Sequence, residues 1–274
     1  MNILKTEKKL SVITSLIEGN SIRSTSRMTG VHKTTIMKVL IEVGENCTRI
    51  MDSSMRSLPC KAIECDEIWT FVRKKEGNVT ATERMIGKIG DQYVFVALDP
   101  ETKLVPVFTI GKRDTATTNV FIQELRRRVK GHPQITTDGF KPYLEAIEMA
   151  FGGEVDYATL VKTFEAENPG RGRYSPPKIS NIEIKNISGF PRKDRICTSF
   201  VERNNLTMRL ALKRLNHLTL AFSKKLENLK AAIALHFAYY NFCSVHGSLR
   251  ITPAMQAGIT NRIWSLAEIA ACNP

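Results

Sequence analysis

The first fifty residues place apolar side chains at the spacing of short helices. Within residues 8–18 they recur every three or four positions, and Gly19 interrupts the pattern. Residues 21–28 and 34–43 repeat this spacing on either side of a short turn that contains Gly30. Two helices joined by such a turn predict a helix-turn-helix.

After residue 61 the pattern changes to the short apolar runs that are typical of strands. Strands are predicted at 62–72, 92–98, 104–110, 135–137 and 155–161, with amphipathic helices at 115–129 and 140–151. The first three strands follow one another through tight turns, which indicates an antiparallel meander. The element order is therefore β-β-β-α-β-α-β.

Residues 165–195 are rich in Pro, Gly, Arg and Lys, and we expect a mobile basic insertion there. Helices are predicted at 198–215 and 224–242. The expected domains are a helix-turn-helix domain at 1–52, a linker at 53–61, an α/β domain at 62–250 and a C-terminal tail at 251–274.

Charge adds the first functional indication. The 274 residues contain 40 Lys and Arg against 27 Asp and Glu, a net charge of +13 that favours a polyanionic partner. The hydrophobic content of 42% excludes general disorder. The longest apolar run, 231–242, is too short for a bilayer, which needs about 20 residues, so we expect a cytoplasmic or nucleoid-associated protein. Six cysteines without a C-x-x-C pair disfavour a zinc site.

The helix-turn-helix carries basic and hydroxyl side chains where DNA would lie. The candidates for phosphate contact are Arg23, Arg27, Lys33 and Lys38, and those for base edges are His32, Thr34, Thr35 and Lys38. The alternative is a plain helical hairpin that serves dimer contacts.

Three acids interrupt otherwise apolar contexts in separate elements. Asp66 lies in the first strand, Asp138 at the end of the fourth, and Glu202 in the first turns of the late helix. A carboxylate in such a context is costly unless it is paired or binds a cation. Oxygen ligands suit Mg²⁺ or Mn²⁺, and two such ions about 3.5–4 Å apart can hold both the attacking and the leaving oxygen of a phosphodiester.

Several stretches resemble transposases of the Asp-Asp-Glu (DDE) class, in the bacterial group of insertion sequence one. The matching stretches are CDEIWTFV, GKRD, ITTDGFKPYLEAIEMAFG, VDYATLVK, RYSPP, TSFVERNNLTMRLALKRL, AFSKKLEN, ALHFAYYNFCSVHGSLRITPAMQAG and WSLAEI. The resemblance implies that Asp66, Asp138 and Glu202 are catalytic metal ligands for two Mg²⁺ or Mn²⁺ ions. Glu67 is expected on the opposite face of the strand, where it would support the metal ligands or serve a structural role.

The resemblance also implies an α/β fold: a ribonuclease-H-like catalytic domain with a mixed five-stranded sheet flanked by helices, after an all-α helix-turn-helix domain. The implied function is metal-dependent cleavage of DNA at insertion-sequence ends, followed by 3′-hydroxyl strand transfer into target DNA. The expected partners are double-stranded DNA and further copies of the chain assembled on it, with no membrane and no nucleotide cofactor.

The late helix gathers basic residues around the third acid. Residues 190–250 contain eleven Lys and Arg against three acids. The helical spacing predicts one face with Glu202, Asn205, Arg209 and Lys213. Together with Arg203, the last three are the candidates for DNA contact beside the metal site.

Two other functions are compatible with parts of the sequence. One is a catalytically silent helix-turn-helix regulator derived from a transposase, for which the loss of at least one carboxylate is expected. The other is a host nuclease of the same fold, against which the resemblance through the C-terminal stretches argues. No Walker A loop is present, and His246 and Arg250 lack the spacing of a tyrosine recombinase.

Overall fold

A six-stranded mixed sheet forms the centre of the computed structural model, which describes residues 4–165, 178–216 and 220–270. The strand order is β3-β2-β1-β4-β5-β6. The strands are β1 (Ala62–Val72), β2 (Gly90–Leu98), β3 (Val107–Gly111), β4 (Gln134–Thr137), β5 (Asp156–Glu165) and β6 (Lys178–Ser188). The first three are antiparallel, whereas β4 runs parallel to β1 and β5 parallel to β4. This arrangement agrees with the predicted ribonuclease-H-like fold.

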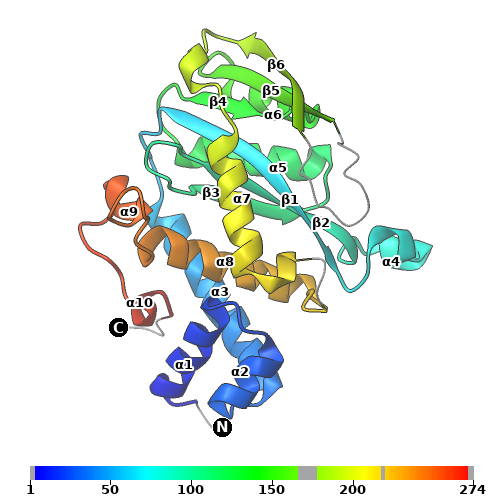
Figure 1. The fold of residues 1–274 in the computed structure, drawn as a ribbon, viewed down its shortest axis with the longest axis vertical. Coiled ribbons are helices and arrows are strands. Elements are labelled where there is room, and N and C mark those ends of the chain that lie inside the picture. Colours follow the sequence, from blue (N-terminus) through cyan, green and yellow to red (C-terminus); the bar gives the residue numbers. More distant parts are fainter. Residues whose placement is uncertain (1–3, 166–177, 217–219, 271–274) are drawn as a thin grey trace.

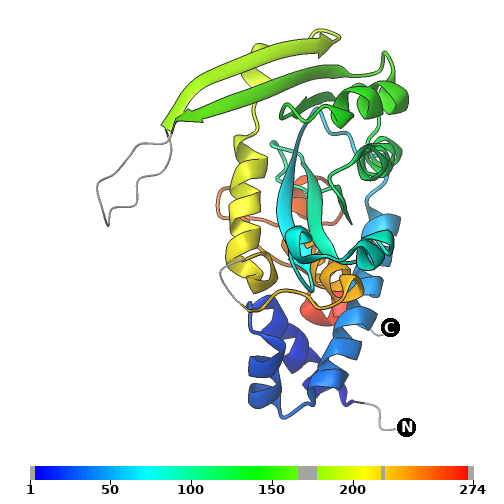
Figure 2. The ribbon, with the colours of Figure 1, turned by 90° about the vertical axis from the view of Figure 1, so that its right-hand side faces the viewer.

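Helices cover both faces of the sheet. Figure 2 shows α5 (Thr115–Arg128) and α6 (Pro142–Phe151) on one side, and α7 (Ser199–Ala211) on the other. Helix α7 contacts β1 and β2, while α5 contacts β2 and β3. The fully buried Phe95, Phe121 and Tyr143 fill the space between β2, α5 and α6.

The N-terminal helices are α1 (Thr6–Ile17), α2 (Ile22–Thr29) and α3 (Lys33–Ser54). Gly30 ends α2 in the left-handed conformation, and His32 accepts the N–H of Thr34 at the start of α3. Helix α3 continues beyond residue 43 and packs along α8 (Leu226–Phe242). It therefore connects the N-terminal helices to the body of the molecule, as Figure 1 shows. The division into domains stays a prediction.

Short elements complete the described chain. They are η1 (Glu76–Asn78), α4 (Ala81–Met85), η2 (Lys193–Arg195), η3 (Lys213–Leu215), α9 (Pro253–Gln256) and α10 (Leu266–Ala270). No helix in the described ranges has the length and apolar character needed to cross a membrane.

The sequence predicted five strands and a mobile insertion over 165–195. This prediction was wrong for the middle of the insertion. Residues 178–188 form β6, which pairs antiparallel with β5. The basic and turn-forming composition of the whole segment obscured the repeated isoleucines of KISNIEIKNIS, and β-branched residues favour strands. Residues 166–177 of the predicted insertion lie outside the described ranges.

The predicted helix 198–215 also ends earlier than expected, at Ala211. The chain then turns so that Leu215 is buried and the carbonyl of Arg214 accepts the hydroxyl of Thr70 in β1. Lys213 consequently lies in the short helix η3 and not on the face of α7 that carries Glu202.

Close packing of α3 on α8 generates a first prediction. A Cβ atom on Gly44 would lie 2.5 Å from the Cα of Ala231 and 2.8 Å from its carbonyl oxygen. Within a helix, glycine normally costs about 1 kcal/mol relative to alanine. Here we expect Gly44→Ala to lower the free energy of unfolding by about 2 kcal/mol instead, because the two backbones must move apart.

Urea unfolding of the full chain measures this effect. Gly77→Ala is the matched control, since a Cβ there meets no atom within 4 Å. An unchanged or higher midpoint for Gly44→Ala would mean that the helices have room for the methyl group.

Candidate active site

Two carboxylates on one face of β1 hold α7 against the sheet. Glu64 is 1% exposed and accepts the N–H groups of Phe200 and Val201, both at 2.9 Å. Two residues further along, Asp66 accepts the side-chain amide of Asn205 at 2.8 Å. Residues i and i+2 of a strand point to the same side. The start and the middle of α7 are therefore tied to neighbouring side chains of one strand.

Asp138 follows the last residue of β4 and begins a turn. Its Oδ1 accepts the N–H of Phe140 at 2.9 Å, and its Oδ2 lies 3.3 Å from Nη2 of Arg113. The Arg113 guanidinium also lies 3.9 Å from the centre of the Phe140 ring. The side chain of Asp138 stays 39% exposed, so it can reach a ligand in solvent.

Glu202 extends from the first turn of α7. Its Oε1 accepts Nζ of Lys162 at 2.6 Å and the hydroxyl of Thr198 at 2.7 Å. Lys162 comes from β5, and its side chain is only 16% exposed. The third acid is thus held by a partly buried cation from β5.

One cavity of about 750 Å³ brings the three predicted acids together. Asp66, Asp138 and Glu202 all line it, although they come from β1, the end of β4 and α7. The cationic side chains on its wall are Arg113, Lys141 and Lys162. The cavity therefore combines carboxylates that suit a metal ion with cations that suit a phosphate.

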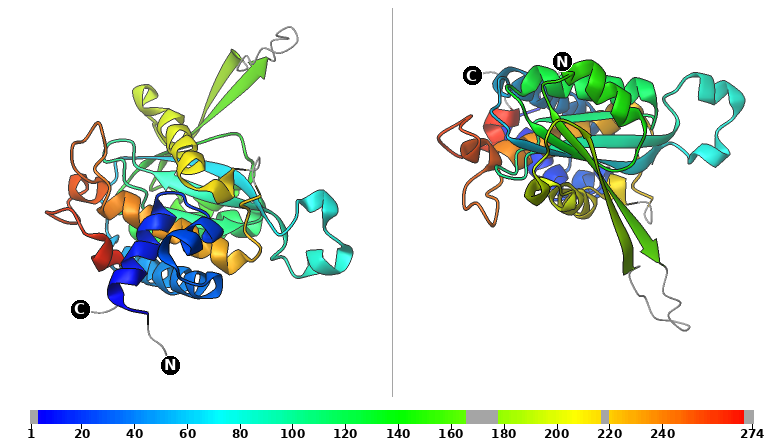
Figure 3. Two further views of the ribbon diagram at one scale, coloured as in Figure 1. Left: turned by 60° about the horizontal axis from the view of Figure 1, so that its bottom comes forward. Right: turned by 90° about the horizontal axis from the view of Figure 1, so that it is seen from above.

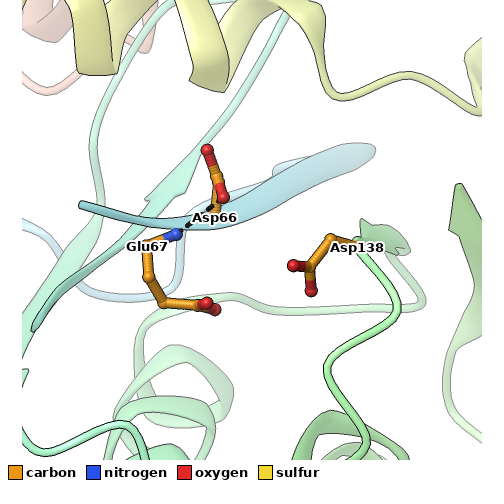
Figure 4. Close-up of side chains that lie close together, drawn as sticks. All are labelled: Asp66, Glu67 and Asp138. Atoms are coloured by element: carbon orange, nitrogen blue, oxygen red, sulfur yellow. Dashed lines mark hydrogen bonds between the residues drawn. The ribbon is translucent and has the colours of Figure 1, made fainter. Parts of the chain in front are cut away.

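Glu67, which was predicted only to support the ligands or the structure, adds a fourth carboxylate. Its side chain leaves the strand on the other side from Asp66 but bends toward Asp138, as Figure 4 shows. Oxygen atoms of Asp66, Glu67 and Asp138 lie within 4.8 Å of one another, close enough to share one cation. The buried Glu67 carboxylate also contacts the hydroxyl of Tyr143 and, at 3.0 Å, Nε of Arg113. Glu202 lines the same cavity but lies outside this group.

Burial makes these acids weaker than usual. It raises the pKa of Asp66 to about 6, with repulsion from Asp138 and Glu202 acting in the same direction. Burial and the charge of Asp138 raise the pKa of Glu67 to about 7. Hydrogen bonds from the Glu67 N–H and from Asn205 partly offset the shift at Asp66. The group of Asp66, Glu67 and Asp138 therefore carries more negative charge than its neighbours compensate.

This donor set fits a divalent metal. The atoms facing one another are carboxylate oxygens, the ligands that Mg²⁺ and Mn²⁺ prefer. A bound cation would relieve the mutual repulsion that raises the pKa of Asp66. Arg113 and Lys162 each neutralise part of the same negative charge.

The predicted DNA contacts divide into two sets. Arg23, Arg27, Lys33, Thr34 and Lys38 are exposed on the N-terminal helices, and Thr35 is half-buried. Arg203 and Arg209 are exposed on α7, as expected. Asn205 was predicted to contact DNA, but it is 2% exposed and donates to Asp66. It therefore orients a carboxylate and is not available to a ligand in solvent.

Sequence reasoning did not single out Arg113 or Lys162. Both lie in stretches that carry the resemblance, GKRD and VDYATLVK. A lone basic residue gives no signal by itself, because its partner is distant in the sequence. Arg113 pairs with acids 46 and 25 positions away, and Lys162 with one 40 positions away.

The raised pKa values generate a prediction for metal binding. As the pH falls below about 6, Asp66 takes up a proton and loses its negative charge, and Glu67 does so already near 7. We expect Mn²⁺ to bind at least about tenfold more weakly at pH 5 than at pH 8, because metal and proton compete for the same oxygens.

Titration calorimetry of the full chain with Mn²⁺ at the two pH values tests this expectation. Asp66→Asn serves as the control, and it should bind weakly at both values. Equal affinity of the unaltered chain at pH 5 and pH 8 would exclude these acids as the ligands.

Comparison with known proteins supports the class suggested by the motifs. A family model described as a DDE domain, and named for the element IS240, matches residues 84–163, from α4 to β5. A search of curated proteins gave no match. Among solved structures, the Mos1 transposase paired-end complex with left transposon end matches at 13% identity with a TM-score of 0.20. That match covers 54% of this chain, which spans 58% of the length of the Mos1 chain.

The DDE domain match includes Asp138 but neither Asp66 nor Glu202. The narrower assignment to the group of insertion sequence one stays a prediction. At the level of the class, the prediction is confirmed: this chain is similar to transposases of the Asp-Asp-Glu class.

Proposed function

We propose that this chain is a DNA transposase that cleaves strands at the ends of an insertion sequence and joins the 3′-hydroxyl to target DNA. The observation that supports it best is the convergence of Asp66, Asp138 and Glu202, from three separate elements, on one cavity. The match to a DDE domain agrees with a transposase-type function.

The residues that would hold divalent ions are Asp66, Asp138 and Glu202, and Glu67 lies close enough to the first two to join them. Two bound ions would supply the charge that activates a water or a 3′-hydroxyl and stabilises the leaving oxygen. The protein's own contribution is to hold these carboxylates in place.

Asn205 and the Glu67 N–H each donate to one oxygen of Asp66, which leaves little freedom to rotate the carboxylate. Preorganisation of this kind avoids the cost of ordering the ligands during the reaction. Arg113 and Lys162 now pair with the acids. If bound cations compensated these acids, the two side chains would be free to contact the phosphates of a bound strand.

DNA is proposed to bind along two basic surfaces. The exposed side chains of α2 and the start of α3 suit the major groove, where base edges can be distinguished. Arg203 and Arg209 on α7 lie on the helix that carries Glu202, and they suit the phosphate backbone beside the cavity.

The catalytic assignment predicts a separation of cleavage from binding. Asp66→Asn and Glu202→Gln should each lower strand cleavage by about 1,000-fold or more, because an amide cannot supply an anionic ligand to two divalent ions. The assay uses DNA containing the sequences that flank the gene, with Mg²⁺, and measures binding in parallel.

Both variants should retain DNA binding, and the exposed Glu145→Gln on α6 should retain both properties. Cleavage that persists in either site variant would refute its assigned role. An unaltered chain that binds these ends but never cleaves them would favour the silent regulator.

A second prediction separates the two basic surfaces. Lys33→Ala with Thr35→Ala should reduce the preference for the element's ends over random DNA. Arg209→Ala should weaken binding to both about equally and flatten the salt dependence by roughly 0.9 log units per lost phosphate contact.

Binding isotherms at several salt concentrations measure both effects. Lys130→Ala, an exposed lysine that follows α5, is the control for general charge. The proposed division fails if Arg209→Ala alters sequence preference while the salt slope stays the same.

A further inference from the structure

The hairpin of β5 and β6 ends the sheet with an open edge. β6 is the last strand in the sheet order, and every residue from 178 to 187 is exposed. Figures 2 and 3 show this hairpin projecting away from the body of the molecule. Backbone groups along such an edge are able to pair with another strand.

The edge carries exposed β-branched apolar side chains along its length. Ile179, Ile182, Ile184 and Ile187 are each between 42% and 51% exposed. A projecting strand with four half-exposed isoleucines is unusual for a surface that meets only water.

Charge argues that the occupant of this edge is protein and not nucleic acid. The described part of the hairpin, 156–165 and 178–188, contains three lysines and three acids, whereas the whole chain has a net charge of +13. A phosphate-binding arm would be expected to share the positive excess. The described strands of the arm are instead neutral and offer a backbone edge and apolar side chains.

The regular part of β6 is short. Its pairing with β5 skips Ser180 and Ile187, which leaves an uninterrupted register only from Asn181 to Asn186. Bulges of this kind prevent pairing of a sheet edge. A new ladder is therefore confined to these six residues, and within them the sequence is Asn-Ile-Glu-Ile-Lys-Asn.

We propose that β6 pairs antiparallel with β6 of a second copy of this chain, with Ile184 facing Ile184 across a two-fold axis. In this register Glu183 of each copy faces Lys185 of the other. Ile182 of each copy lies diagonal to Ile184 of the other, so four isoleucines form one cluster on the opposite face. The interface is self-complementary, as two-fold symmetry requires.

Neighbouring registers lack this complementarity. A shift by two residues in one direction places Glu183 opposite Glu183, and in the other direction Lys185 opposite Lys185. A shift by one residue places a charged side chain opposite Ile184. Like charges directly across a ladder destabilise it, and opposite charges stabilise it. The pairing involves the hairpin alone and does not depend on the catalytic role of the cavity.

Charge reversal tests the register directly. Five facing residues make a contact smaller than the ~1,200 Å² of stable specific interfaces, so association is measured by sedimentation at up to about 100 µM protein. Glu183→Lys and Lys185→Glu should each raise the dimer dissociation constant about tenfold or more. The double variant Glu183→Lys/Lys185→Glu should return it to the value of the unaltered chain.

Glu148→Lys and Lys130→Glu are the matched controls, since each makes the same charge change at an exposed site outside the hairpin. The proposal is overturned if the unaltered chain stays monomeric, if the single variants dimerise normally, or if the double variant fails to recover. Single variants that dimerise normally but bind DNA more weakly would overturn the proposal and indicate that nucleic acid occupies the edge.

Cross-linking supplies a readout that does not depend on affinity alone. Ile184→Cys faces its own copy and should form a disulfide-linked dimer with copper phenanthroline as oxidant. Ile187→Cys should not, because the antiparallel register places it about 20 Å from its symmetry mate. The unaltered chain gives the background from its native cysteines. Equal cross-linking at 184 and 187 would contradict the register.

Discussion

The attachment of α7 to β1 through two carboxylates is the interaction on which the candidate site depends. The first N–H groups of any helix lack partners within it, and here buried Glu64 accepts two of them. Asp66 accepts Asn205 one helical turn further along. Glu202 lies in the same first turn, so the contact at Glu64 also fixes where the third acid enters the cavity.

This attachment is costly, because it places several acids where water is scarce. Burial raises the pKa of Glu64 to about 7 and that of Asp66 to about 6. These two carboxyl groups therefore bind their protons more tightly in the folded protein than in the unfolded chain. Their contribution to the free energy of unfolding declines as the pH rises from about 4.5 toward 7. Arg113 and Lys162 compensate part of the negative charge. A group of buried carboxylates that is only partly compensated by cations is well suited to bind a metal ion.

Much of the fold follows from local patterns. Apolar spacing predicted the helices on either side of Gly30 and the three-stranded meander, because helix and strand periods are properties of neighbouring residues. Asp66, Asp138 and Glu202 could be selected because each interrupts an apolar stretch, and the structure brings them to one cavity. β6 was missed because its alternation lies within a longer segment whose composition is typical of a loop.

The sequence by itself determined the order of the first five strands and of the two helices between them, the excess of positive charge and the placement of three acids in separate elements. Tertiary structure alone decided that Asn205 faces Asp66, that Glu67 bends toward Asp138 and that Lys162 holds Glu202. The physical reason is that the period of a strand or helix fixes only where a side chain starts. Where the end of a long polar side chain lies depends on partners brought close by the fold, many residues away in the sequence.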